Sequence, residues 1–257
     1  MILDFDDSIW LKDVSKGNRK FAFLKRPGKT SRIIQLADSV IVGNEYLANY
    51  SRKFNPRVFV IPTTIDTSYY VPLSDRCIDR KPVCIGWTGS STTLKHFALA
   101  IPVFKHLKRK YGESVNFLMI SDEFYQEEVD GLEKLRWVRE REVSDLQKID
   151  IGIMPLPDDD WSKGKCGFKG LQYMALEIPT VMSPVGVNAD IVQDGENGFL
   201  ADGHDEWVEK LSWLIESREM REKLGKAGRK TVVEHYSVEA NKHKWLEAFQ
   251  SVFHGKT

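Results

Sequence analysis

The chain has 257 residues, enough for one large domain or about one and a half ordinary ones, and its 42% hydrophobic and 29% charged residues are typical of globular proteins. Its 37 lysines and arginines equal its 37 aspartates and glutamates, which argues against a dedicated nucleic-acid-binding protein with its usual basic excess. The three cysteines (Cys77, Cys84 and Cys166) show neither a disulfide framework nor zinc-ligand spacing, and no apolar run approaches the roughly 20 residues that span a bilayer, so we expect a cytoplasmic protein without a metal site.

The first 66 residues predict an incomplete α/β unit. Strands are expected at residues 2–5, 39–42 and 58–61, and Asn44 can cap a helix that extends toward Tyr50. About three strands are fewer than a complete nucleotide-binding half of such a fold needs. Asp4, Asp6 and Asp7 follow one another closely at its start, and for them we favour a role facing a cleft or capping a turn over metal binding.

A basic stretch lies within this first unit. Residues 16–32 hold seven basic side chains and no acidic one, interleaved with Phe21, Phe23 and Leu24. A solvated helix face is the simpler interpretation. The alternative is a weak contact with an acidic acceptor or with the inner face of a membrane, which would make the protein peripheral.

Residues 67–236 predict a second and more complete unit. Strands are expected at 83–86, 116–120, 137–138, 150–154, 180–182 and 198–200, with long helical segments between them or after them. This alternation predicts a Rossmann-like parallel sheet with crossover helices, hence an α/β fold with a second, partial α/β domain. The last helix, in residues 237–257, is expected to return to the N-terminal part.

The first loop of this unit is a candidate phosphate site. It reads Gly86-Trp-Thr-Gly-Ser-Ser91 and follows a predicted strand, so Gly86 and Gly89 would let backbone approach a diphosphate while Thr88 and Ser90 offer hydroxyls. It matches neither the dinucleotide fingerprint nor a P-loop, and an ordinary tight turn remains the alternative. Ser121-Asp122 ends the next strand at the same predicted edge, where a capping role is favoured over contact with a ribose or base.

The segment with the most candidate binding features is residues 164–188. A glycine-rich turn carrying Lys165, Gly167 and Lys169 opens a helix, whose free N–H groups and dipole favour an anion. The loop after the next strand, with Val185 and Gly186, lies at the edge of the sheet where ligands bind. These features predict a phosphate-bearing ligand such as a nucleotide derivative, with Lys169 the better phosphate candidate of the two lysines.

Residues 161–188 resemble the donor-binding segment of the family 4 glycosyltransferases, which have the two-domain GT-B fold. The matching pattern is W-x-x-G-K-C-x-F-K-x-L-Q-Y-M-A, followed by P-x-V-x-S-P-V-G-V-N in a bacterial subgroup of that family, and it includes Phe168 and Gln172. The resemblance continues through residues 60–66, 150–156 and 194–200. It implies a retaining hexosyltransferase of bacterial glycan synthesis that uses a nucleotide diphosphate sugar and needs no cofactor. It also implies binding through Lys95 and Arg139, for which a solvated surface lysine and a solvated run of charges at residues 136–142 are the alternatives.

Several positions depart from the family pattern. Gly164 and Gln172 stand where most members have two glutamates, one for the donor sugar and one for the ribose, although an amide can still hydrogen-bond a ribose hydroxyl. The arginine that normally precedes Lys95 is missing, so Lys165 or Lys169 is expected to supply its charge. Glu177 replaces the usual glycine at a helix end, at a cost of about 1 kcal/mol if its backbone is left-handed.

Residues 1–66 resemble only the end of the family's acceptor-binding domain. The resemblance therefore implies that a missing N-terminal domain or a partner chain completes the acceptor site, and no catalytic residue is assigned. The alternatives are a non-catalytic nucleotide-binding fragment or subunit of a split glycosyltransferase, or an enzyme that hydrolyses or epimerises sugar nucleotides.

Overall fold

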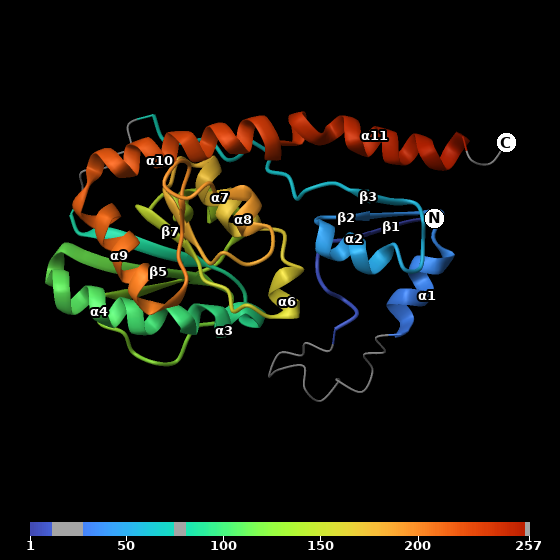
Figure 1. Ribbon diagram of the computed structural model, residues 1–257. Coiled ribbons are helices and arrows are strands. Elements are labelled where there is room, and N and C mark those ends of the chain that lie inside the picture. The colour runs from blue at the N-terminus through green and yellow to red at the C-terminus, as the bar shows by residue number, and fades with distance from the viewer. Residues whose placement is uncertain (12–27, 75–80, 255–257) are drawn as a thin grey trace.

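The structure, a computed structural model, describes residues 1–11, 28–74 and 81–254 (Figure 1). The centre of the basic stretch, residues 12–27, and Cys77 lie outside these ranges. The described chain forms two parallel sheets, one of three strands and one of six, each flanked by helices. The predicted α/β fold is confirmed.

The smaller sheet has the strand order β1-β2-β3. Alternating segments build it: β1 (Ile2–Phe5), α1 (Gly28–Leu36), β2 (Ser39–Val42), α2 (Glu45–Ser51) and β3 (Val58–Val60). The side chains of β2 are all buried, between the helices on one face and the C-terminal helix on the other. Asn44 caps α2 as predicted, because its Oδ1 accepts a hydrogen bond from the Leu47 N–H at 2.9 Å.

The larger sheet has the strand order β6-β5-β4-β7-β8-β9. Its strands are β4 (Val83–Thr88), β5 (Val115–Ser121), β6 (Leu132–Arg136), β7 (Ile151–Met154), β8 (Thr180–Met182) and β9 (Phe199–Leu200). The strand expected at 137–138 was placed too late in the chain, because the alternating sequence of 132–136 pairs with β5. From β4 the chain adds β5 and β6 on one side of the sheet and then adds β7, β8 and β9 on the other side of β4. The strand order therefore reverses between β4 and β7. The connections diverge at this point and leave a crevice at the carboxyl ends of the two strands.

Helices cover both faces of this sheet. They are α3 (Leu94–Phe97), α4 (Ile101–Tyr111), α5 (Glu142–Leu146), α6 (Asp160–Lys163), α7 (Phe168–Ala175), α8 (Asn188–Ile191), α9 (Gly203–Glu216) and α10 (Arg218–Thr231). On one face Phe104 of α4 stacks on Phe117 of β5 with ring centroids 4.1 Å apart. On the other face α7 packs through Leu171 and Tyr173. This double coverage explains why the central strands read as continuous apolar runs.

The two sheets are joined by the long C-terminal helix. Figure 1 shows α10 and α11 (Val238–His254) running along one side of the molecule, from the larger sheet to the smaller. Ala248 and Trp245 of α11 pack against Ile41 and Ile61 of the smaller unit. At the junction the Ile65 N–H donates to the Tyr236 carbonyl at 2.8 Å. None of the described helices is long and apolar enough to cross a membrane.

Candidate functional site

A cavity of about 390 Å³ opens at the carboxyl end of β4, close to the point where the strand order reverses. We call it the Lys169 cavity. Six of the predicted site residues line it: Thr88, Gly89, Ser90, Phe168, Lys169 and Gln172. Asp122, Trp137 and Glu142 complete the lining. The loop after β4 and the start of α7, which lie far apart in sequence, therefore meet at one cavity.

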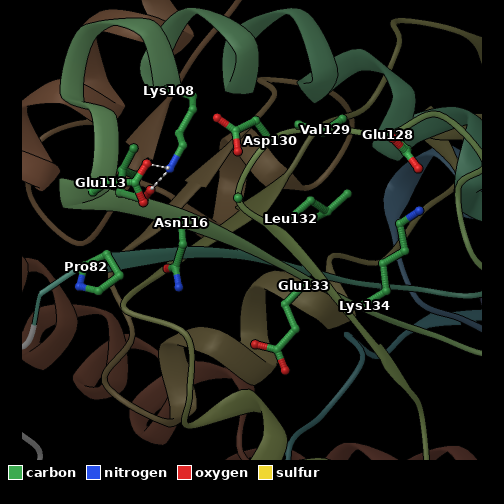
Figure 2. A pocket seen from close by; sticks show the side chains of 12 residues that line it. Pro82, Lys108, Glu113, Asn116, Glu128, Val129, Asp130, Leu132, Glu133 and Lys134 are labelled. Carbon is green, nitrogen blue, oxygen red and sulfur yellow. Dashed lines mark hydrogen bonds and ion pairs between the residues drawn. The ribbon is translucent and has the colours of Figure 1, made fainter.

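A larger cavity, of about 930 Å³, lies elsewhere (Figure 2). It is lined by Pro82, Val115 and Leu132, which precede or begin β4, β5 and β6. This position is the amino-terminal edge of the sheet, whereas ligands of open α/β sheets bind beyond the carboxyl edge. We therefore place the functional site in the smaller cavity.

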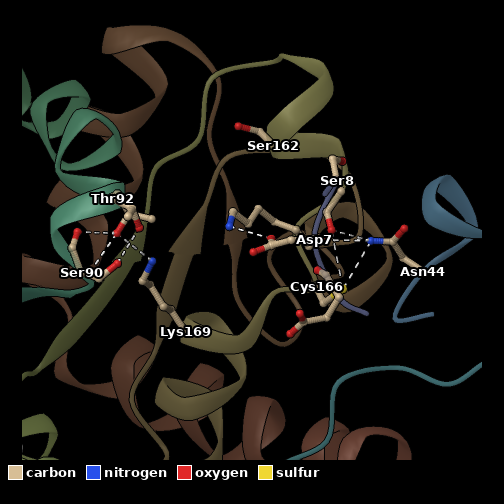
Figure 3. Close-up of polar contacts among 12 residues, drawn as sticks. Asp7, Ser8, Asn44, Ser90, Thr92, Ser162, Cys166 and Lys169 are labelled. Atoms are coloured by element: carbon tan, nitrogen blue, oxygen red, sulfur yellow. Dashed lines mark hydrogen bonds and ion pairs between the residues drawn. The ribbon is translucent and has the colours of Figure 1, made fainter. Parts of the chain in front are cut away.

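Lys169 brings a cation to the loop after β4. Its Nζ donates to Thr93 Oγ1 at 3.4 Å and lies 5.4 Å from the centroid of the Trp87 ring. Figure 3 shows the side chain pointing toward Ser90 and Thr92, whose hydroxyl oxygens are 2.8 Å apart. Burial, and then the ammonium of Lys165, lower the pKa of Lys169 to about 8. An anion in the cavity would be attracted to the Lys169 ammonium and would favour its protonated form.

Further positive charge surrounds the same loop. His96 is buried, and its pKa falls to about 4 through burial and through the charges of Lys169, Lys95 and Lys165. Its Nε2 has no hydrogen-bond partner among the described residues. The positive charges of three lysines thus act on this one buried ring, although only Lys169 lines the cavity. The region around the ring suits a ligand of high negative charge.

Asp122 fixes the shape of the loop after β4. Its carboxylate accepts hydrogen bonds from the Ser91 N–H at 2.6 Å and from Ser91 Oγ at 3.1 Å. Gly89 allows a tight turn, because a Cβ there would lie 2.1 Å from the Trp87 ring. No helix begins directly after Asp122 in the described chain, so it is not the helix cap that was expected; its carboxylate instead fixes the distant loop after β4.

Lys165 lies at the junction of the two units instead of in the cavity. Its Nζ forms an ion pair with Asp7 Oδ1 at 2.7 Å. The neighbouring turn is also held by the smaller unit, because the Asn44 amide donates to the Gly164 and Lys165 carbonyls at 3.2 and 3.3 Å (Figure 3). The Cys166 thiol, with a pKa raised to about 12 mainly by burial, donates to the Asp6 carbonyl at 3.2 Å. Asp7 thus faces the junction, and Lys165 shares its charge with it.

The other predicted residues lie outside the cavity lining. Gly86 is within β4, where a Cβ would lie 2.3 Å from Ile149, so packing requires this glycine. Gly167 caps α7 with a left-handed backbone, at φ 72°. Lys95 is exposed on α3, and Arg139 is exposed in the short turn Arg139–Arg141, where its carbonyl accepts a 3.4 Å hydrogen bond from the Tyr69 hydroxyl.

Val185 and Gly186 also lie beside the cavity rather than in its wall. Val185 belongs to the apolar core around α7. Gly186 has φ 57°, and a Cβ there would approach the Lys163 carbonyl oxygen to 2.9 Å. Both residues therefore shape the loop after β8, at the edge where they were expected.

Two cavity residues, Trp137 and Glu142, are missing from the sequence-based prediction. They follow the carboxyl end of β6, a placement that could have been inferred with the correct bounds of that strand. Glu142 Oε1 accepts from the Trp137 indole at 3.0 Å, and Oε2 accepts from the Tyr70 hydroxyl at 2.7 Å. Among the described residues there is no group of three or more potential metal ligands.

Comparison with known proteins identifies the family of this chain. The family model for glycosyl transferases group 1 matches residues 78–231. The poly(ribitol-phosphate) alpha-N-acetylglucosaminyltransferase of Staphylococcus aureus is 29% identical over 88 residues, which cover 33% of this chain and only 18% of that relative.

Solved structures share the fold at low sequence identity. Sucrose-phosphate synthase from Thermosynechococcus elongatus matches with a TM-score of 0.72 and 14% identity, over 99% of this chain and 68% of its own. The Anabaena protein HepE, in complex with UDP and glucose, matches with a TM-score of 0.73 and 14% identity, over 97% and 71%. The family match covers more than half of this chain, and the chain therefore belongs to the group 1 glycosyl transferases and has their GT-B type of α/β fold.

Proposed function

We propose that this chain binds a nucleotide diphosphate sugar in the Lys169 cavity and takes part in transferring the sugar, with retention at the anomeric carbon. The observation that carries the proposal is the Lys169 ammonium beside the hydroxyl-rich loop after β4, at the carboxyl edge of the sheet. Group 1 membership supports a sugar donor, and the HepE structure, which holds UDP and glucose, supports a nucleoside diphosphate.

The chemistry of transfer fits the charges of this region. When the bond from the anomeric carbon to the diphosphate breaks, negative charge develops on the departing phosphate oxygens. Lys169 would stabilise this charge directly, and Lys95 and Lys165 would contribute at longer range. We propose no cofactor besides the donor, and an acceptor site completed by a further N-terminal domain or a partner chain.

The proposal is tested with nucleotide binding by calorimetry. We expect the chain to bind UDP or GDP, and Lys169→Ala to weaken binding by about 1.5–3 kcal/mol, the range for a hydrogen bond to a charged group. Lys230→Ala on α10 is the matched control, since it removes one exposed lysine outside the cavity. A chain that binds no nucleoside diphosphate, or equal losses in both variants, would contradict the proposal.

One observation favours a second candidate, a subunit that binds the nucleotide without transferring sugar. Gly164 brings no side chain to the position of the family's donor-sugar glutamate, and a Cβ there would lie 2.0 Å from Ser8 Oγ. Turnover of a panel of nucleotide sugars, with and without a polypeptide that supplies an N-terminal half, separates the two candidates. Transfer that requires the second polypeptide supports the split enzyme, and nucleotide binding without transfer in either case supports the binding subunit.

A further inference from the structure

The Lys169 cavity has a second set of polar groups, and these include a negatively charged carboxylate. Glu142 and Trp137 line it together with Gln172, and all three come from segments other than the loop after β4. Trp137 is 40% exposed, whereas Gln172 is only 2% exposed. The cavity therefore joins a cationic site at Lys169 with an anionic and aromatic site at Glu142 and Trp137.

Glu142 is held in place by a chain of hydrogen bonds. The Gln172 amide nitrogen donates to the Tyr70 hydroxyl at 2.8 Å, and this hydroxyl donates to Glu142 Oε2 at 2.7 Å. The Trp137 indole fixes the other carboxylate oxygen at 3.0 Å. Tyr70 is buried, and burial together with the Glu142 contact raises its pKa, so it stays a donor. The carboxylate is thus oriented before any ligand arrives.

This carboxylate can accept further hydrogen bonds. Two ionised oxygens offer about four acceptor positions, and Tyr70 and Trp137 use one on each oxygen. Of the two carboxylates that line the cavity, Asp122 is engaged with Ser91 in shaping the loop after β4. Glu142 is therefore the better candidate for contact with a ligand.

The ligand group at Glu142 must donate hydrogen bonds and cannot carry negative charge. A phosphate there would be repelled by the carboxylate, whereas the same phosphate beside Lys169 is attracted. A ribose carries adjacent hydroxyls that can donate to one carboxylate, and an attached base offers a flat face for an exposed indole. A nucleoside diphosphate has both properties at opposite ends, as the cavity has.

We propose that Glu142 accepts hydrogen bonds from the ribose hydroxyls of the nucleoside diphosphate, that Trp137 contacts the attached base, and that Tyr70 is a positioning residue for Glu142. The proposal rests on nucleotide binding in the Lys169 cavity, the function proposed above. It assigns the role of ribose acceptor to a carboxylate on α5, while the buried Gln172 supports it through Tyr70.

Calorimetry with UDP, GDP and ADP first identifies a nucleotide that binds, and its 2′-deoxy form and inorganic pyrophosphate are then compared. In the unaltered chain the 2′-deoxy form should bind about 10-fold more weakly or worse, because a hydrogen bond to a charged group is lost. Glu142→Gln should weaken the ribonucleotide about 10- to 100-fold. It should also remove most of the discrimination against the 2′-deoxy form and leave pyrophosphate binding unchanged.

Asp122→Asn is the matched control, since it changes a carboxylate of the same cavity to an amide. It should weaken pyrophosphate and nucleotide alike and keep the discrimination. If the unaltered chain does not distinguish the two nucleotides, or if Glu142→Gln still does, the proposal is overturned. Failure to bind any nucleoside diphosphate would instead refute the function on which it rests.

Discussion

Glu177 ends α7 in a conformation that glycine adopts more easily. Its φ is 57°, the only positive value at a non-glycine position in the described chain. Its N–H donates to the Met174 carbonyl at 3.1 Å, and the Ile178 N–H donates to the Tyr173 carbonyl at 3.0 Å. These are the two hydrogen bonds of a Schellman motif, which requires the left-handed residue at this position.

The turn cannot relax to avoid this conformation. A Cβ at Gly225 of α10 would lie 2.2 Å from the Glu177 carbonyl oxygen, so α10 packs directly on the turn. A left-handed non-glycine residue costs about 1–2 kcal/mol. Glycine loses about 0.4–1 kcal/mol more conformational entropy on folding. Glu177→Gly should therefore stabilise the chain by about 0.5–1 kcal/mol, the difference between these two effects.

The assay is urea unfolding followed by circular dichroism, with the denaturant slope unchanged between variants. Glu177→Ala is the control, because alanine loses the glutamate side chain but keeps the left-handed strain. The free energy of unfolding of Glu177→Gly is expected to be higher than that of Glu177→Ala. A glycine variant no more stable than the alanine variant would show that the positive φ carries no strain here.

Two further outcomes follow from the site. Because the pKa of Lys169 is lowered to about 8, this lysine loses its proton as the pH rises from 7.5 to 9.5. The diphosphate stays ionised over this range, so the nucleotide affinity measured by calorimetry should fall. The affinity of Lys169→Ala should not change with pH over the same range. Gly164→Ala should lower the free energy of unfolding by about 1–3 kcal/mol, because the added methyl group overpacks against Ser8. Adding Ser8→Gly in a double variant should recover most of this loss. If thermal unfolding instead shows that the losses of the two substitutions add, the contact is contradicted.

The sequence predicts the parts of the site that depend on local pattern. The loop after β4 and the turn at residues 164–169 are each recognisable from glycine, hydroxyl and lysine spacing. Their meeting follows from parallel strands, whose carboxyl ends share one edge. Thr88, Ser90, Lys169 and Gln172 therefore line one cavity, although no single segment of the sequence contains it.

Contacts between distant segments could not be predicted in the same way. Asn44 meets the turn at Gly164 across 120 positions, and Tyr70 meets Gln172 across 102. No motif or periodic pattern in the sequence links the two residues of either pair. Glu142 lies in a run of alternating charges typical of a solvated surface, and nothing in the sequence indicates its contact with Tyr70, 72 positions away.

Two of the departures from the family pattern, at positions 164 and 172, have different physical consequences. At 164 the smaller unit approaches so closely that Ser8 leaves no room for a side chain, so glycine there is a requirement of the junction. At 172 the amide does what a glutamate would do less well, because its nitrogen donates to Tyr70 and so turns the hydroxyl proton toward Glu142. An ionised carboxylate at 172 could only accept, and it would compete with Glu142 for that one proton. Gln172 and Glu142 therefore work as a pair, and the carboxylate of this pair lies on α5 instead of α7.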